Sequence, residues 1–270
     1  MVTLLFSLPV HEGNETIRDT IANVRKHNGE QHHIMLHVSR HWDGFDSTIA
    51  DLPRVHVNPM RWPTGHAHSQ VPTHVSNVKH AESLSLPFTH VVILHTSELF
   101  VRAGMSAHVG RYEFSTWFTP STQPTDITWP PMNHAKALFG WGSEALGNLI
   151  EGSWWSRQLF NRMSQWILDR AGLEQWVLPV ALEECVFPTL AWHLSGGANH
   201  THPYCAFKHD QHFLTDTSYV DDIREGRPII AWQAQNFTYD WQAITSDGFY
   251  SVKRIARDID DPMRRYIRSL

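Results

Sequence analysis

Residues 2–38, VTLLFSLPVHEGNETIRDTIANVRKHNGEQHHIMLHV, carry the pattern that decides the fold. They open with Val2–Leu8, an apolar run of strand length. Apolar side chains then recur at the spacing of one helix face over residues 14–28, and Gly29 stands where a helix ends. A second apolar run follows at Ile34–Val38. A strand–helix–strand unit of this length predicts two parallel strands joined by a right-handed crossover.

The same kind of pattern continues along the chain. It predicts strands over 54–57, 90–94, 228–232 and 249–252, helices over 75–86, 156–171 and 183–194, and a surface loop over 119–131. The chain shows neither an internal repeat nor a linker. We therefore expect one α/β domain over residues 1–270, with a mixed, mostly parallel central sheet flanked by helices. Residues 1–100 are expected to form a nucleotide-binding half, and 101–270 an acceptor and catalytic half.

Composition excludes several classes of protein. With 41% hydrophobic and 18% charged residues, the 270-residue chain can form a buried core. A net charge of -5 argues against a nucleic-acid partner, and no apolar run reaches the about 18 residues of a membrane span. The apolar residues 1–8 indicate a buried strand and not a signal peptide. Cys185 and Cys205 are too few for a disulfide framework and suit a reducing, cytoplasmic compartment.

Twenty histidines and twelve tryptophans leave two other functions open. His66 and His68, like His200 and His202, form HxH pairs that can bind a metal ion, so a metal-dependent hydrolase is one alternative. Neither pair has a carboxylate at a recognisable spacing, and buried or surface histidines explain them as well. Tryptophan rings can stack on sugars, which makes a non-catalytic carbohydrate-binding protein the second alternative.

Carboxylates suggest a third chemistry. The segment after the 90–94 strand offers one carboxylate, Glu98, which is a poor cage for Mg²⁺ or Mn²⁺. The Asp258-Ile259-Asp260 motif lies near the C-terminus, where a helix start explains it. A bound diphosphate would therefore need side-chain cations, and Lys253 and Arg254 close an apolar strand where they can face a cleft. Glu183 and Glu184 open a helix, either as charges favoured by its dipole or as a general base for a hydroxyl.

Five segments follow one another along the chain: residues 1–39, 95–102 (HTSELFVR), 151–157 (EGSWWSR), 183–190 (EECVFPTL) and 240–253. In this order they resemble the motifs of the core-2/I-branching N-acetylglucosaminyltransferase family, which also includes peptide O-xylosyltransferases. The resemblance implies a GT-A fold and an inverting, metal-independent transfer of a sugar, GlcNAc or xylose, from a UDP-sugar to a hydroxyl of a glycan. It implies no cofactor besides the donor. A bacterial or viral cytoplasmic relative fits a chain with neither anchor nor disulfides, and the oligomeric state stays open.

The resemblance also implies residue roles. Glu184 would be the general base, and Lys253 with Arg227 would neutralise the departing diphosphate. The remaining residues on the donor side would be Pro9, Val10, Ser39, Ser97, Glu98 and Arg254, and those on the acceptor side Glu151, Ser153, Trp155 and Glu183. Trp155 would stack on a sugar ring. Ser39 stands where the family has an aspartate that contacts uracil, although UDP is still the expected nucleotide.

Overall fold

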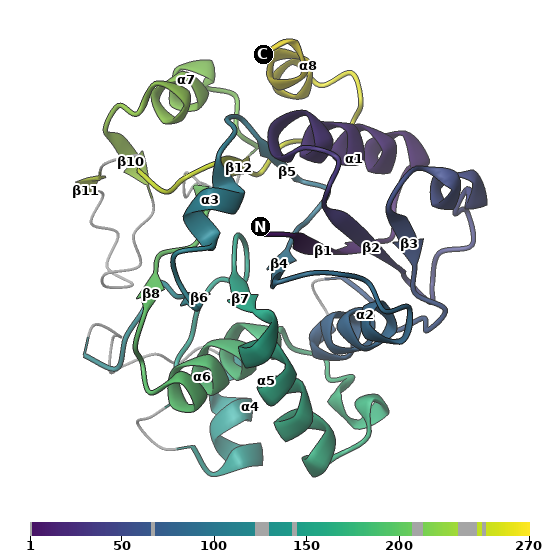
Figure 1. Ribbon diagram of the computed structural model, residues 1–270, viewed down its shortest axis with the longest axis vertical. Helices are drawn as coiled ribbons and strands as arrows, with labels where there is room; N and C mark the ends of the chain where they lie inside the picture. Colours follow the sequence, from purple (N-terminus) through teal and green to yellow (C-terminus); the bar gives the residue numbers. More distant parts are fainter. Residues whose placement is uncertain are drawn as a thin grey trace.

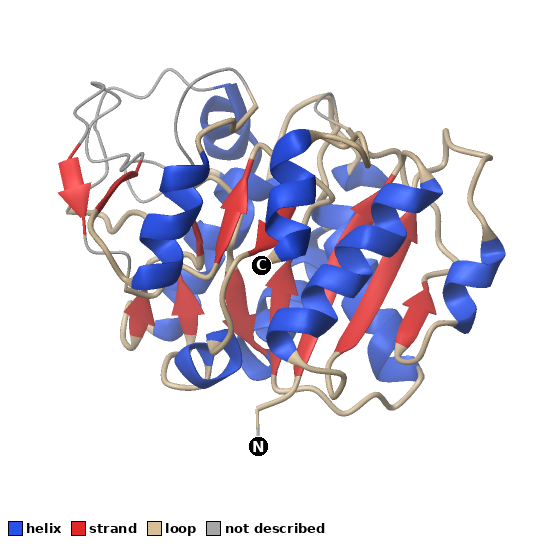
Figure 2. Cartoon of the chain, turned by 90° about the horizontal axis from the view of Figure 1, so that it is seen from above, coloured by secondary structure: helices blue, strands red, loops and turns tan. Residues whose placement is uncertain are grey.

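A computed structural model describes residues 2–65, 68–121, 130–141, 145–206, 213–231, 242–244 and 247–270. The chain is an α/β protein with a mixed, mostly parallel central sheet and helices on both faces (Figures 1 and 2). In spatial order the strands of this sheet are β3 (Val55–Val57), β2 (His33–Val38), β1 (Leu4–Val10), β4 (His90–Ile93), β7 (Trp154–Ser156), β6 (Phe114–Ser115) and β8 (His200–Thr201).

Strand direction changes across this sheet. The first four strands pair in parallel, with β1 between β2 and β4. Strand β7 then runs antiparallel to both β4 and β6. Since successive strands after β1 are added on opposite sides of it, the sheet has a topological switch point between β1 and β4. Ligands of open α/β sheets bind in the crevice outside the carboxyl ends of the strands at such a point.

Alternation along β1 builds a core on each face of the sheet. Leu4, Phe6 and Leu8 pack with α1 (Asn14–Asn28). Leu5 points to the other face, into the core shared by α2 (Val71–Ser83), α5 (Arg157–Arg170) and α6 (Glu183–Ser195). Elements packed on both faces of β1 cover it, which explains why all seven of its residues are buried.

A second, three-stranded sheet lies beside the first (Figure 1). In it a strand from the end of the chain pairs with two strands from earlier parts of the chain. Strand β12 (Ser251–Lys253) lies between β5 (Glu98–Phe100), which is antiparallel to it, and β9 (Cys205–Ala206), which is parallel. Helices α7 (Thr217–Glu225) and α8 (Pro262–Ser269) pack with this sheet in a third apolar cluster. The remaining elements are α3 (Met105–Val109), α4 (Pro130–Phe139), the hairpin β10 (Ile229–Ala231) and β11 (Gln242–Ile244), and the 3₁₀ turns η1 (Ser47–Asp51) and η2 (Leu173–Trp176).

The predicted α/β class and the parallel strand–helix–strand opening are confirmed. The helices expected over 156–171 and 183–194 are α5 and α6, almost residue for residue. The helix expected over 75–86 starts earlier, at Val71, because Pro72 is accepted in a first helical turn. Most of the loop expected over 119–131 falls outside the described residues, and α4 begins at its end. Among the described residues, none of the helices has the length and apolar character needed to cross a bilayer.

Candidate functional site

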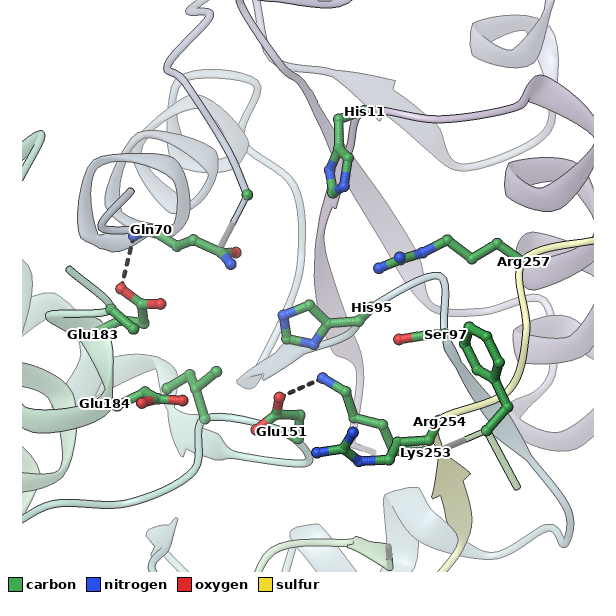
Figure 3. A pocket seen from close by; sticks show the side chains of 14 residues that line it. His11, Gln70, His95, Ser97, Glu151, Glu183, Glu184, Lys253, Arg254 and Arg257 are labelled. Carbon is green, nitrogen blue, oxygen red and sulfur yellow. Dashed lines mark hydrogen bonds and ion pairs between the residues drawn. The ribbon is translucent and has the colours of Figure 1, made fainter. Parts of the chain in front are cut away.

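A cavity of about 280 Å³ opens at the switch point of the central sheet (Figure 3). His11, the first residue after β1, and His95, two residues after β4, both line it. The start of α6 and the segment before β7 supply a wall of carboxylates, and the end of β12 with the residues that follow it supplies a wall of cations. We call these the acidic wall (Glu151, Glu183 and Glu184) and the basic wall (Lys253, Arg254 and Arg257).

Glu183 belongs to the acidic wall and also holds two helices together. It is the first residue of α6, and its Oε2 accepts a hydrogen bond of 2.8 Å from the backbone N–H of Gln70, which precedes α2. The side chain is 2% exposed. Burial is the largest effect on its ionisation and raises the pKa to about 8, although the bond from Gln70 acts in the opposite direction.

Glu184, the expected general base, lies one residue further along α6 and faces the same cavity. Burial raises the pKa of Glu184 well above its ordinary value, and the negative charges of Glu151 and Glu183 raise it further. Lys253 lowers it. A raised pKa makes this carboxylate a stronger base than a solvated glutamate, which is the property that proton abstraction from a hydroxyl requires.

Lys253 and Glu151 join the two walls. The Nζ of Lys253 forms an ion pair with Oε1 of Glu151, and both side chains are less than one-fifth exposed. The charge of Lys253 helps to lower the pKa of Glu151. Breaking a pair this buried leaves a charge without its counterion, so the two residues depend on each other.

The other two cations of the basic wall follow β12. Arg254 has a backbone φ of 69°, a left-handed conformation that ends the strand and turns the chain along the cavity. Arg257 is tethered to the loops that follow β1 and β4, because its Nε lies 2.6 Å from Oε1 of Glu12 and 3.2 Å from Oγ1 of Thr96. Its guanidinium therefore stands beside His11 and His95, as Figure 3 shows.

His95 lies in the middle of the cavity, between the acidic and the basic wall (Figure 3). Burial lowers the pKa of His95 well below its usual value, and the neighbouring charge of Lys253 lowers it further. A neutral imidazole here leaves the positive charge of the cavity to the lysine and the arginines. Its Nδ1 is buried and has no hydrogen-bond partner among the described residues, so it is able to bond to a ligand.

Of the donor-side residues expected from the sequence, Ser97 lines the cavity and Glu98 does not. Glu98 is fully buried and is paired in register with Lys253 across β5 and β12. Its Oε1 accepts a hydrogen bond of 2.7 Å from Oγ of Ser251, and burial raises its pKa to about 7. Glu98 therefore supports the strand that carries Lys253, in place of the expected contact with the donor.

The prediction that Trp155 stacks on an acceptor sugar is wrong. The indole is 1% exposed and packs against Phe160 and Phe187 in the core beneath the sheet. Neighbouring Trp154 points to the opposite core, since successive residues of a strand face opposite sides. Ser153 is also buried outside the cavity, where its carbonyl accepts from the N–H of Ile93.

Arg227 is the other donor-side residue that the structure places elsewhere. It lies in the turn after α7, half exposed, where its guanidinium pairs with Asp222 at 2.6 Å and with Glu225. It does not line the cavity, because two carboxylates of α7 hold its guanidinium. Arg257, which sequence reasoning did not assign to the site, stands in the cavity instead.

Pro9, Val10 and Ser39 are buried at the ends of β1 and β2 and do not line the cavity. Their backbone shapes the loop that carries His11, because the N–H of Ser39 donates to the carbonyl of Val10 at 2.9 Å. The hydroxyl of Ser39 accepts from the N–H of Thr64. All three act as structural supports of the expected nucleotide-binding edge.

The histidine pairs do not form a metal centre among the described residues, in which no three histidine, cysteine or carboxylate side chains stand close enough to hold an ion. His200 and His202 instead bond to backbone carbonyls, those of Gly197, Pro203 and Asp247. His66 lies outside the described residues. Asp258 and Asp260 precede α8, whose N-cap is Asp261.

Sequence reasoning also missed several lining residues. His11 and His95 carried a signal, because residues just after the strands on either side of a switch point face the ligand crevice. Phe213 carried none, since it lies outside the regular elements, yet it is 58% exposed and lines the cavity beside the basic wall.

A scan against models of known protein families finds no match for this chain, and a search among curated protein sequences finds none either.

Proposed function

We propose that this protein is an inverting, metal-independent glycosyltransferase of GT-A type that moves a sugar from a UDP-sugar, with GlcNAc or xylose as the sugar, to a hydroxyl of a glycan acceptor. One observation carries the proposal. Glu184 and Lys253, which the sequence resemblance pairs as base and leaving-group cation, lie far apart in the chain and line the same cavity. That cavity lies at the switch point, where α/β sheets bind nucleotides.

In the proposed reaction Glu184 takes the proton of the acceptor hydroxyl. The hydroxyl oxygen forms a bond to the anomeric carbon while the bond from that carbon to the diphosphate oxygen breaks on the opposite face. The configuration at the anomeric carbon is therefore inverted. One buried carboxylate with a raised pKa is sufficient for this single displacement.

The electron pair of the broken bond stays on the departing UDP, whose negative charge grows in the transition state. Lys253, Arg254 and Arg257 are fixed positive charges on the wall opposite Glu184. Preorganised cations at developing negative charge supply the largest electrostatic contribution in many enzymes. Here they take the place that Arg227 has in the sequence-based hypothesis.

Neither alternative function gains support from a specific contact. Among the described residues no tryptophan is fully exposed, and the large apolar side chains that are exposed are Met60, Leu84 and Phe213. A sugar-binding platform of tryptophans therefore has no counterpart in the described part of the chain. Of the two HxH pairs, His200 and His202 bond to backbone carbonyls.

The test is a comparison of the wild-type protein with Glu184→Gln. Release of UDP from UDP-GlcNAc or UDP-xylose is measured over a panel of glycan acceptors, with UDP binding followed by titration calorimetry. Loss of a positioned general base is expected to lower kcat by about 10²–10⁴-fold and to leave UDP binding within about two-fold. The exposed Glu30→Gln is the matched control and is expected to behave as the wild type.

Three results would contradict the proposal. Turnover of Glu184→Gln at the wild-type rate removes Glu184 as the base. Loss of activity in EDTA with recovery on adding Mn²⁺ contradicts leaving-group stabilisation by side chains. If none of UDP, GDP and CMP raises the unfolding temperature of the protein and a glycan does, the carbohydrate-binding alternative is favoured.

A further inference from the structure

A second cavity, of about 570 Å³, lies at the other end of β12. Lys253, the last residue of β12, faces the candidate site, whereas Tyr250, which precedes the strand, lines this second cavity. We call it the arginine cavity, after the side chains that give it its charge. Its principal lining residues are Arg102, Arg111, His108, His202, Tyr112 and Tyr250.

The arginine cavity has an excess of positive charge. Arg102 and Arg111 both line it, and Asp247 is the one carboxylate among its described lining residues. Arg102 is held over the ring of Tyr250, with 4.7 Å between its Cζ and the ring centre. Arg111 is exposed and forms no ion pair with a described carboxylate.

The positive charge of the cavity acts on the ionisation of His108. Burial and then the charges of the nearby His202, Arg111 and Arg102, in that order, lower its pKa to about 4. Its Nε2 is buried and lacks a hydrogen-bond partner among the described residues. A polar atom in that state is satisfied when a ligand with an acceptor oxygen fills the cavity.

Hydrogen bonds and close packing fix the part of the arginine cavity formed by His202 and Gly248. His202 bonds to the carbonyls of Pro203 at 2.8 Å and Asp247 at 3.0 Å, which fixes its ring. Gly248 has a φ of 82°, and a Cβ added there would lie 2.8 Å from Cε1 of His202. The backbone therefore packs directly on the histidine, an approach that only glycine allows.

We propose that the arginine cavity binds the phosphate group of a small phosphorylated sugar. The two guanidinium groups supply charge-assisted donors, and Nε2 of His108 supplies a third donor for the remaining phosphate oxygen. The rings of Tyr112 and Tyr250 contact the sugar, since aromatic faces pack well on the apolar face of a pyranose. This site is separate from the one that holds the donor diphosphate.

The experiment is titration calorimetry with glucose 6-phosphate as the probe. Glucose tests whether the phosphate is needed, and glucuronate tests whether a carboxylate serves as well. Arg111→Glu reverses a charge on an exposed side chain, so the fold is expected to survive, which thermal unfolding verifies. Arg111→Lys keeps the charge and removes the planar fork. Arg162→Glu, an exposed arginine on α5, is the matched control.

Binding of glucose 6-phosphate is expected to weaken at least ten-fold in Arg111→Glu and less in Arg111→Lys, and to stay unchanged in Arg162→Glu and in Lys253→Met. Equal binding of glucose overturns the phosphate requirement, and tighter binding of glucuronate overturns the choice of anion. Binding that is lost in Lys253→Met and kept in Arg111→Glu places the phosphate in the candidate site. Absence of binding to the wild-type protein overturns the proposal outright.

Discussion

The acidic and the basic wall of the candidate site face each other across one cavity but are built differently. Two residues of the acidic wall start a helix, and the first of them, Glu183, is 2% exposed. The basic wall begins at the last residue of a strand and becomes more open along the chain, from the side chain of Lys253, 15% exposed, to that of Arg257, 38% exposed. Burial raises the pKa of Glu183 to about 8 and that of Glu184 well above its ordinary value.

The difference has a chemical meaning. A group that exchanges protons near neutral pH needs a raised pKa, and removal from water raises the pKa of a carboxyl group. Guanidinium groups stay charged in either environment, so the basic wall does not need such tuning. Glu151 and Lys253 are the point where the two environments meet, because they form an ion pair across the boundary.

Among the variants of the two walls, the largest loss of activity is expected from removing the charge of Lys253, which pairs with Glu151 between them. Lys253→Met is expected to lower kcat by about 10²–10³-fold, the loss typical for one preorganised group at developing charge. UDP release under saturating donor measures it. Lys79→Met is the matched control, because Lys79 pairs with Glu82 on the surface of α2 and is expected to leave kcat unchanged.

The double variant Glu151→Gln/Lys253→Met separates chemistry from folding. The single variant leaves Glu151 buried without its counterion, which destabilises the fold, and the double variant removes that penalty. Thermal stability is therefore expected to recover in the double variant while kcat stays low. Recovery of kcat together with stability would mean that Lys253 serves the fold and not the reaction.

The two walls also differ in how well sequence predicts them. Glu183 and Glu184 open a helix whose period is visible locally, so their position follows from a short segment. The role of Glu184 as the base is implied only by the family resemblance. Lys253 depends on the register of β12 with β5, which sets it opposite Glu98 from a remote part of the chain. The place of Lys253 at the end of a strand is visible locally, but only the motif order assigns it to the same site as Glu184.

The failed predictions have the same origin. Whether Trp155 meets a ligand depends on which sheet face is covered, and both faces of β7 are covered. Arg227 precedes a strand as expected, yet carboxylates on the neighbouring helix α7 capture its guanidinium. Local patterns predict strands and helices, whereas the packing of distant elements decides which side chains reach a cavity.

A smaller effect is expected in the pH dependence of stability, through Glu183. The folded protein holds a proton on Glu183 up to a pKa of about 8, whereas the unfolded chain releases it near the ordinary 4.5. The stabilisation from this proton is complete below the lower value and is lost as the pH rises through the higher one. Glu183→Gln lacks this contribution at every pH.

The stability of the wild-type protein relative to Glu183→Gln should therefore fall between pH 5 and pH 8, by at most about 1.4 kcal/mol per pH unit. Urea unfolding at a series of pH values measures the difference. Glu30→Gln, at an exposed position, is expected to give a flat line. A flat line for Glu183→Gln as well would show that the acidic wall is solvated and not tuned by burial.

The smallest expected effect concerns Phe213, at the rim beside the basic wall. Its ring is 58% exposed, and the next residue is fixed by a hydrogen bond of 2.8 Å from the N–H of Leu214 to the carbonyl of Arg254. A ring so placed can supply the sugar contact that buried Trp155 does not. Phe213→Ala is expected to raise the acceptor KM about three- to ten-fold with little change in kcat, since one ring contact contributes about 0.5–1.5 kcal/mol.

Steady-state kinetics at varied acceptor concentration measures this effect, and two further variants serve as controls. Phe213→Tyr keeps a ring at the rim and should stay close to the wild type. Leu84→Ala removes another exposed apolar side chain, at the far end of α2 and away from the cavity, and should leave KM unchanged. A fall in kcat with unchanged KM would place Phe213 with the basic wall, which we propose acts on the leaving diphosphate. The acceptor would then approach from the acidic wall alone.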